Sequence, residues 1–295
     1  MTQVSKTVAK KQFCLRFDVD TAACIEAGVP ALLAPAERQH VYFTFHVNMG
    51  RAVSYSSMIR KMLFRDGVGP SEHASSTKTK KLGSLKKLGH LEYIRTAILN
   101  PVVGAANGAI IRRALNAGHE IGLHGGKNHA TWQYNAHTWS AARIHREILW
   151  GKRRLEDICG TEIKSFSSPG WNGSSLINKV LSQLHFDYVA DLHGSTSVTE
   201  RPLEVPIIPN IRTRLTGEPG GVGYLEWLVA SHDSKTEMLG VVSSELKNNE
   251  PLTVMYDHPC YAGRGQLALL SEIIDLVRER DYEITTICKA LTHRA

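Results

Sequence analysis

Long apolar runs are missing from the sequence. No stretch of eighteen consecutive apolar residues occurs, so no transmembrane helix is predicted. Residues Met1 to Gln12 are polar and carry lysines, and no apolar stretch lies behind them, which argues against a cleavable secretion signal. We therefore expect a cytoplasmic protein.

Closely spaced cysteines are also lacking. The five cysteines are spread over 295 residues without a Cys-x-x-Cys pair, so a structural zinc knuckle is not indicated. An odd and scattered set is typical of reduced thiols in a cytosolic protein. The five are Cys14, Cys24, Cys159, Cys260 and Cys288.

Positive charge is concentrated in one stretch. Residues 51–100 contain ten basic and three acidic residues, an excess equal to the net charge of +7 of the whole chain. Such a segment attracts an anionic membrane surface, a phosphorylated lipid or a nucleic acid, or it is simply a solvated basic loop. Binding of a nucleic acid has little support, because the basic segment contains no recognisable nucleic-acid-binding motif. The expected phosphate or membrane contacts are Arg51, Arg60, Lys61 and Arg65, and the apolar residues expected to enter the membrane interface are Phe64, Tyr93, Ile94 and Leu99.

Strand and helix patterns alternate along the chain. The clearest helices are Ala141–Cys159, which Gly160 ends, and Gln266–Arg278. The alternation favours a mainly parallel sheet, open or closed into a barrel, in a single α/β domain over residues 1–295, with a basic insertion at 51–103 after the second strand. The predicted strands are Phe13–Asp18, Val41–Val47, Glu120–His124, Ser165–Ser168, Tyr188–Asp191, Leu203–Ile208 and Thr253–Asp257.

Two carboxylates close the first predicted strand. Parallel sheets place function at the carboxyl ends of their strands, where Asp18 and Asp20 lie. Carboxylates two residues apart point the same way, so one must be protonated or a cation must hold both. Taken alone, the segment from Phe17 to Asp20 is better explained as an Asx-turn, and only the other strand ends favour a site.

Imidazoles follow the third predicted strand. His124 ends the strand, and Asn128 and His129 lie in the loop after it. One Asp with two His is a normal open set for zinc and similar ions. The sequence therefore predicts a metal site that includes His124 with Asn128 or His129. Surface histidines in a glycine-rich loop would give the same sequence pattern.

Three further strand ends carry polar groups. The backbone N–H groups of Gly170 and Trp171 could hold an oxyanion. Asp191 offers another carboxylate, and His258 could donate a proton. Each segment alone fits an ordinary turn, but polar groups at five ends of one parallel sheet predict a single catalytic site.

In this order the motifs resemble the polysaccharide deacetylase family, also called carbohydrate esterase 4 or NodB homology. The resemblance covers nearly the whole chain and rests on Phe-Asp-Val-Asp at 17–20, Gly-His-Glu-Ile-Gly-Leu-His at 118–124, Pro-Gly-Trp at 169–171 and Tyr-Asp-His at 256–258. The Asn-Met-Gly-Arg stretch at 48–51 and the basic insertion look most similar to one bacterial subgroup. Its enzymes deacylate an amino sugar on undecaprenyl phosphate, either as deformylases of a formamido-arabinose lipid or as N-acetylhexosamine deacetylases.

The resemblance implies a distorted (β/α)7 barrel that binds one divalent metal, zinc in preference to manganese, cobalt or nickel. It implies that Asp18 is the catalytic base, that His258 is the general acid, and that Asp20 and His124 are metal ligands. The expected reaction removes an acetyl or formyl group from a lipid-linked amino sugar during lipid A or envelope glycolipid modification. The enzyme would then lie peripherally on the cytoplasmic face of the inner membrane.

The sequence departs from the family pattern at two positions. The second histidine usually lies four residues after the first, where this chain has Asn128 followed by His129. We expect His129 to be the third ligand, with Asn128 as the alternative, because nitrogen binds such metals better than an amide oxygen. The family often has an arginine two residues before the motif proline, where this chain has Ser167, so we expect Asp191 to tune the base instead.

Two other functions remain open at this point. The first is a hydrolase of the same fold that acts on a soluble amide or imide. The second is a non-catalytic protein that binds lipid or another anion and keeps only a vestige of the site.

Overall fold

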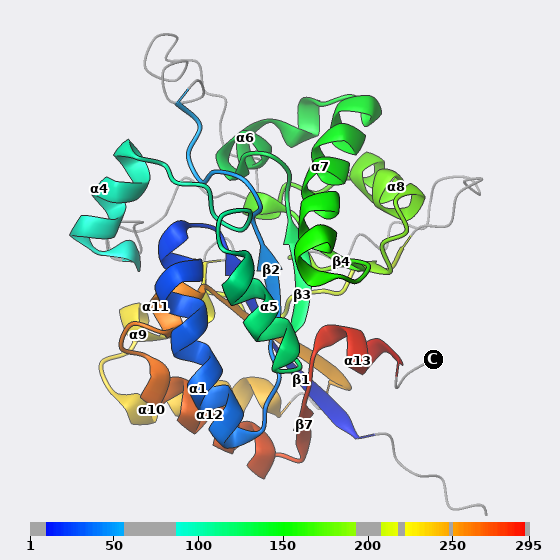
Figure 1. Cartoon of the computed structure of the whole chain (residues 1–295). Coiled ribbons are helices and arrows are strands. Elements are labelled where there is room, and N and C mark those ends of the chain that lie inside the picture. The colour runs from blue at the N-terminus through cyan, green and yellow to red at the C-terminus, as the bar shows by residue number, and fades with distance from the viewer. Residues whose placement is uncertain (1–9, 56–86, 193–207, 218–221, 248–249, 293–295) are drawn as a thin grey trace, which may run out of the picture.

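The computed structural model describes residues 10–55, 87–192, 208–217, 222–247 and 250–292 (Figure 1). All pairings between its named strands are parallel, and the sheet runs in the order β5-β4-β3-β2-β1-β6, with β7 paired to the start of β1. This curled sheet, surrounded by helices, confirms the expected α/β fold of the distorted (β/α)7 type. The strands are β1 (Lys11–Val19), β2 (Thr44–Val47), β3 (Glu120–His124), β4 (Ser165–Ser167), β5 (Tyr188–Val189), β6 (Leu252–Asp257) and β7 (Tyr282–Ile284).

An irregular segment joins the two edges of the curled sheet. Residues 209–215 run between β5 and β6 and bond to both: the N–H of Ile211 donates to the Val189 carbonyl at 2.7 Å, and the N–H of Tyr256 donates to the Leu215 carbonyl at 3.0 Å. Backbone groups at both edges are therefore paired, which closes the sheet. The strand expected at Leu203–Ile208 lies outside the described residues except for its last position.

Helices cover the outside of the sheet, with α1, α5, α7 and α12 around it in Figure 1. Helix α7 has the predicted bounds, and α12 begins and ends one residue later than predicted. The α-helices are α1 (Val29–Gln39), α4 (His90–Ile98), α5 (Gly108–Asn116), α6 (His129–Asn135), α7 (Ala141–Cys159), α8 (Ser175–Gln183), α9 (Tyr224–Ser231), α10 (Lys235–Leu246), α11 (Pro259–Ala262), α12 (Leu267–Glu279) and α13 (Ile287–Thr292). Short helices of other types are the π-helix η1 (Cys24–Gly28) and the 3₁₀ helices η2 (Ala136–Thr138) and η3 (Pro169–Trp171). Within the described part of the chain, no helix is long and apolar enough to cross a membrane.

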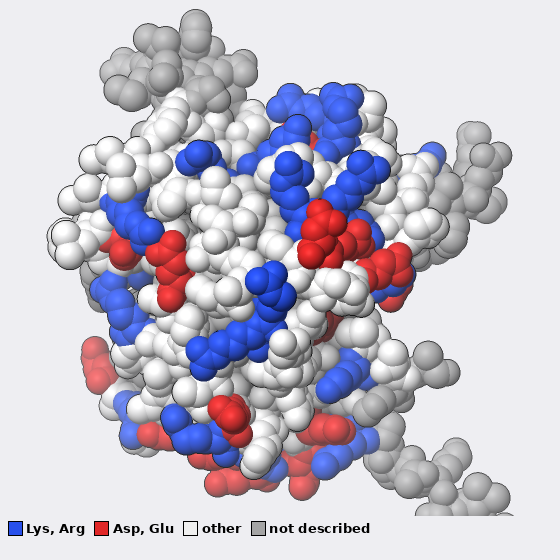
Figure 2. Space-filling view, in the orientation of Figure 1, with Lys and Arg blue, Asp and Glu red and all other residues white. Residues whose placement is uncertain are grey.

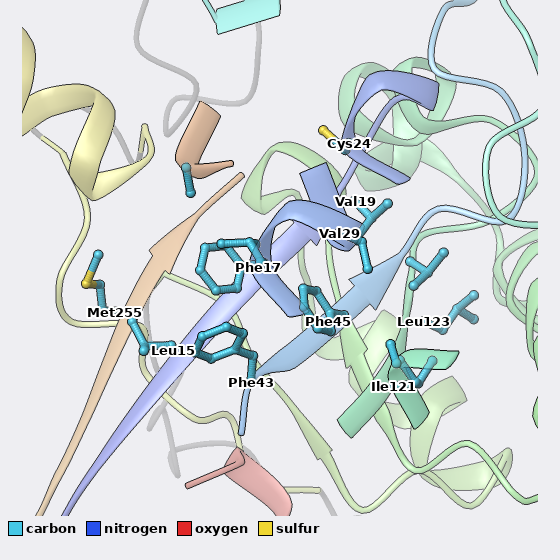
Figure 3. Close-up of a cluster of buried hydrophobic side chains, with 14 of the residues drawn as sticks. Leu15, Phe17, Val19, Cys24, Val29, Phe43, Phe45, Ile121, Leu123 and Met255 are labelled. Carbon is cyan, nitrogen blue, oxygen red and sulfur yellow. The ribbon is translucent and has the colours of Figure 1, made fainter. Parts of the chain in front are cut away.

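The two faces of the sheet differ in polarity. Successive side chains on a strand point to opposite faces. From Phe13 onward the odd positions of β1 are apolar, and Leu15, Phe17 and Val19 pack with apolar side chains of neighbouring elements in Figure 3. The even positions Arg16 and Asp18 therefore point to the other face, the inside of the curl, although both are almost completely buried.

A glycine on β3 makes room on that inner face. A Cβ atom on Gly122 would lie 2.5 Å from the Cδ2 atom of His46 and 2.3 Å from the Oγ atom of Ser165. Three neighbouring strands thus converge there, and only a residue without a side chain fits between the imidazole and the hydroxyl. The interior is packed with polar side chains, and the carboxyl ends of the strands hold the candidate site.

Candidate active site

Asp18 is clamped by an arginine from its own strand. The Nε atom of Arg16 donates to Oδ1 of Asp18 at 3.1 Å, and the second guanidinium nitrogen donates to Oδ2 at 2.7 Å. The i, i+2 spacing places both side chains on the inner face, so one extended strand makes a bidentate pair. Burial raises the pKa of Asp18, but Arg16 and the neighbouring His124 outweigh it and hold the pKa below its ordinary value. Asp18 is therefore ionised at neutral pH.

Asp20 faces two imidazoles with one of its oxygens. Oδ1 lies 3.3 Å from Nε2 of His124 and 3.4 Å from Nε2 of His129. That oxygen is buried and has no hydrogen-bond partner. The three ligand atoms lie within 4.8 Å of one another, and one oxygen with two nitrogens suits zinc and similar ions. The residues present therefore fit a divalent metal.

Neighbouring groups give the imidazoles of His124 and His129 the orientation and the protonation state that metal binding requires. Nδ1 of His124 lies 2.6 Å from the Ser167 hydroxyl, which fixes the ring so that Nε2 points at Asp20. Burial lowers the pKa of His129, although Asp20 opposes the shift, so this imidazole is neutral near pH 7. A neutral imidazole is the form that binds metal.

The local fold separates Asn128 from His129. Asn128 caps α6: its Oδ1 accepts the N–H of Thr131 at 2.9 Å, and its Nδ2 donates to the Val53 carbonyl at 2.8 Å. Both Oδ1 and Nδ2 of Asn128 thus form hydrogen bonds to the backbone that stabilise the local fold. The next residue, His129, opens the helix and directs its ring to Asp20. The geometry favours His129 over Asn128 as the third ligand.

His258 approaches the other oxygen of Asp20. Its Nε2 lies 3.1 Å from Oδ2 of Asp20, and its Nδ1 lies 3.0 Å from Oε1 of Glu226, which comes from α9. Burial and Lys87 lower the pKa of His258, but Asp20 and Glu226 outweigh them and raise it to about 10. His258 therefore carries a proton at neutral pH, as a general acid requires.

Lys87 supplies a second cation at the same carboxylate. Its ammonium nitrogen lies 3.3 Å from Oδ2 of Asp20. Burial lowers the pKa of Lys87, yet Asp20 and Glu226 raise it on balance, so the amine stays charged. Burial also raises the pKa of Asp20, but His129, Lys87 and His258 hold it well below its ordinary value. The two oxygens of Asp20 thus have separate surroundings.

The turn after β4 uses one of the two expected oxyanion donors internally. The N–H of Trp171 donates to the Ser168 carbonyl at 3.0 Å, which corrects the expectation for that group and makes Gly170 the better candidate. Gly170 and Trp171 both have left-handed backbone, with φ of 62° and 59°. The Trp171 ring covers Arg16, 4.9 Å from the guanidinium carbon, and so forms a wall of the site.

Asp191 supports this turn and does not clamp the base. Its carboxylate accepts the N–H and the hydroxyl of Ser168, each at 2.9 Å, while Arg16, rather than the Asp191 that we expected to tune the base, bonds to Asp18. Burial raises the pKa of Asp191. Ser167, where the family often has arginine, contacts Asp18 through its hydroxyl at 3.4 Å.

Of the expected phosphate contacts, only Arg51 lies within the described residues. Its guanidinium donates to the carbonyl of Asn100, and the residue is exposed. Arg60, Lys61 and Arg65 lie outside the described residues, and so does Phe64. The described part of the insertion instead presents α4, whose apolar residues face outward.

Sequence reasoning missed four functional candidates: Arg16, His46, Lys87 and Glu226. The alternation on β1 could have placed Arg16 beside Asp18. His46 pairs with Asp18 across β1 and β2, and its Nδ1 lies 3.7 Å from the carboxylate, with both ring nitrogens buried and without hydrogen-bond partners. No local pattern signals Glu226 or Lys87, because only the folded chain brings them to the site.

A curled parallel sheet that gathers carboxylates, histidines and a group of residues that fits a metal ion at its carboxyl edge is typical of a hydrolase of the α/β barrel class. Comparison with known proteins agrees: the model of the family described as polysaccharide deacetylase matches residues 5–189. The chain belongs to the polysaccharide deacetylase family. It is an amide hydrolase that acts on the N-acyl groups of amino sugars.

Individual relatives cover most of the chain. The Shewanella sediminis (strain HAW-EB3) protein named "Probable 4-deoxy-4-formamido-L-arabinose-phosphoundecaprenol deformylase" is 26% identical over 288 residues, which is 95% of this chain and 85% of the relative. A polysaccharide deacetylase structure from Mycobacterium smegmatis superposes with a TM-score of 0.63 at 16% identity, covering 99% of this chain and 93% of that one. The Puue allantoinase structure gives a TM-score of 0.62 at 11% identity, covering 96% and 89%. Both structures share the fold.

Proposed function

We propose that the protein removes the formyl or acetyl group from an amino sugar carried on a lipid phosphate such as undecaprenyl phosphate, in envelope glycolipid modification. The observation that supports this most is the division of labour between two neighbouring carboxylates. Asp18 is held by Arg16, whereas Asp20 directs Oδ1 to two imidazoles and Oδ2 to His258. A metal-dependent amide hydrolase with a carboxylate base uses such a separation, because the base must accept a proton while the ligand holds the metal.

Asp20, His124 and His129 are the residues that would hold the metal. A divalent ion there supplies Lewis acidity, which lowers the pKa of water and polarises the acyl carbonyl. Zinc suits two imidazoles and a carboxylate, and manganese, cobalt or nickel can use the same donors.

The residues of the chain handle the two proton transfers. Asp18 accepts the proton of the attacking water, and its ionised state at neutral pH permits this. His258 donates a proton to the departing sugar nitrogen, and Glu226 holds its imidazole from behind. The N–H of Gly170 is the candidate donor to the developing oxyanion. The products are a small carboxylic acid and a free amino sugar.

Helix α4 suits a substrate that resides in a membrane. Leu91, Ile94 and Ile98 lie at helical spacing, with 84%, 52% and 68% of their surfaces exposed. Ordinary surface helices bury their apolar stripe, whereas α4 presents it to solvent. The outer surface of this helix is largely uncharged in Figure 2. On another side, Arg95 pairs with Glu26 at 2.7 Å and anchors the helix near the site.

This apolar face, with the basic residues of the insertion around it in the sequence, fits the surface of an anionic bilayer. The protein would bind there peripherally while its substrate remains in the membrane. Flotation with vesicles of phosphatidylcholine, with and without phosphatidylglycerol, tests this at low salt. Replacing Leu91 and Ile94 by Asp should abolish retention, and Leu176→Asp, a change at another exposed apolar residue, should not. Equal retention of all three proteins would remove the membrane surface from the proposal.

The reaction itself is tested with the purified metal-loaded enzyme. Undecaprenyl-phosphate-linked 4-formamido-4-deoxyarabinose and its N-acetyl analogue are incubated with it, and mass spectrometry identifies which acyl group is lost. Asp18→Asn and His258→Ala should abolish turnover while metal content is retained, and Asp275→Asn, on the exposed side of α12, should behave as the unchanged enzyme. Turnover of a soluble amide without turnover of either lipid would contradict the proposed substrate class.

A further inference from the structure

Two cysteines from distant parts of the sequence meet beside the site. The Sγ atoms of Cys24 and Cys260 lie 2.9 Å apart, although 236 residues separate them in the chain. Cys24 is fully buried and Cys260 is 6% exposed. A disulfide bond measures about 2.05 Å, so the two sulfurs need to approach by less than about 1 Å to form one.

The two thiols lie at the contact between η1, which follows Asp20, and α11, which follows His258. Cys24 begins η1, four residues after Asp20, and Cys260 lies in α11, two residues after His258. The backbones of these elements touch, because a Cβ atom on Gly28 would lie 2.3 Å from the carbonyl carbon of Pro259. The sulfurs therefore face each other between η1 and α11, whose backbones are already in contact.

Electrostatics single out Cys24 as the reactive thiol. Burial raises its pKa, but the hydrogen bond with Cys260 and the nearby Lys87 ammonium lower it to about 6. Burial raises the pKa of Cys159 to about 11 and also raises that of Cys288, so these thiols stay protonated. Thiolates are the nucleophilic form, which gives Cys24 an advantage over both.

We propose that Cys24 and Cys260 form a reversible disulfide when a hydroperoxide reaches the site. The Cys24 thiolate attacks one peroxide oxygen, the O–O bond breaks, and the departing oxygen takes a proton and leaves as water or an alcohol. The Cys260 sulfur then attacks the sulfur of the Cys24 sulfenic acid. The S–O bond breaks, and the hydroxyl leaves as water with the proton of the Cys260 thiol. A small-molecule dithiol restores both thiols by exchange.

Disulfide formation also alters the site. The two sulfurs approach by rotation of the cysteine side chains together with a small displacement of α11 against η1, whose backbones already touch at Gly28 and Pro259. His258 directly precedes α11, and its Nε2 lies 3.1 Å from Asp20. We expect oxidation to displace this contact and to cause a loss of turnover that a dithiol reverses. This consequence rests on the proposed function, whereas the disulfide itself does not.

Titration of the metal-loaded protein with hydrogen peroxide tests the proposal. After alkylation of free thiols, mass spectrometry should find a peptide that links Cys24 to Cys260, and dithiothreitol should remove the link. Cys24→Ser should prevent it, whereas the matched variant Cys159→Ser should form it as the unchanged protein does. Alkylation of both Cys24 and Cys260 after peroxide treatment, or a link between other cysteines, would overturn the proposal even if the Cys24 variant does not fold.

Turnover before and after peroxide provides the second measurement. A disulfide that forms without loss of turnover would overturn the effect on the site. An enzyme that is inactive on every amino-sugar substrate before oxidation would contradict the proposed function, while the linked peptide would still decide whether the disulfide forms.

Discussion

Glu226→Gln isolates the carboxylate behind the general acid. Oε1 of Glu226 lies 3.0 Å from Nδ1 of His258, and both side chains are buried. Glutamine has nearly the same shape, and its amide oxygen can still accept the Nδ1–H of the imidazole. The substitution therefore removes a negative charge and preserves the packing. Because Glu226 raises the pKa of His258, its replacement should lower that pKa.

The size of the shift follows from the contact. A hydrogen bond to a charged group contributes about 1.5–3 kcal/mol, and a neutral one about 0.5–1.5 kcal/mol. The difference is roughly 1–2 kcal/mol, and since about 1.4 kcal/mol corresponds to one pKa unit, we expect a shift of about one unit. The reaction needs His258 protonated, so the alkaline limb of the kcat/KM profile should move to lower pH by about one unit. Above that limb the variant should be roughly tenfold slower than the unchanged enzyme.

The pH profile of kcat/KM for the metal-loaded enzyme measures this shift. Metal content and thermal denaturation of each protein show that the site and the fold are retained. Glu272→Gln is a matched control, because Glu272 pairs with Lys235 at 2.7 Å on the surface. An alkaline limb that stays in place in Glu226→Gln, with metal content unchanged, would refute the assignment of Glu226 as the residue that supports the acid.

Four further substitutions test other parts of the structure. Arg16→Lys keeps the charge but loses the bidentate clamp on Asp18, so the acidic limb of the kcat/KM profile should rise by roughly one pH unit. His129→Ala should weaken metal binding, measured by competition with a chelator, by more than about 100-fold, whereas Asn128→Ala should cost about 1 kcal/mol of unfolding free energy through its lost cap and retain the metal. Gly28→Ala should lower the unfolding free energy in denaturant titration by roughly 1–3 kcal/mol, because its Cβ meets the backbone of Pro259.

The elements that the sequence predicted well are those with long local patterns. Helix α7 has nineteen residues with a regular apolar stripe, and its bounds were predicted to the residue. Strand β7 was missed because three residues, Tyr282–Ile284, are too few to establish an alternation. The segment 209–215 was missed for another reason. It pairs with both sheet edges through isolated bridges and bonds, and its sequence, Pro-Asn-Ile-Arg-Thr-Arg-Leu, offers only two large aliphatic residues, Ile211 and Leu215, and no run that marks a strand.

Residues of the site divide in the same way. Asp18, Asp20, His124 and His258 lie at or directly after strand ends, and the rule that parallel strands end at one edge was enough to predict that they come together. Glu226 lies on α9, 32 residues before the histidine that it contacts, and its own helix gives no sign of that partner. Tertiary contacts of this kind depend on the path of the connecting chain, which no local pattern contains.

The alternation of side chains along β1 is enough to predict that Arg16 lies beside Asp18 in the site. Positions 16 and 18 share the inner face of β1, and Asp20 follows two residues later at the strand end. One extended segment thus supplies the clamp, the proposed base and the proposed ligand in order, with apolar residues between them on the opposite face. A shift of one residue in pairing would bring Phe17 and Val19 inward and turn all three polar groups toward the helices. The charged pair of Arg16 and Asp18 would then lose its hydrogen-bond partners in the interior. Its burial would lower the free energy of unfolding. The fold and the chemistry of this site therefore depend on the same register.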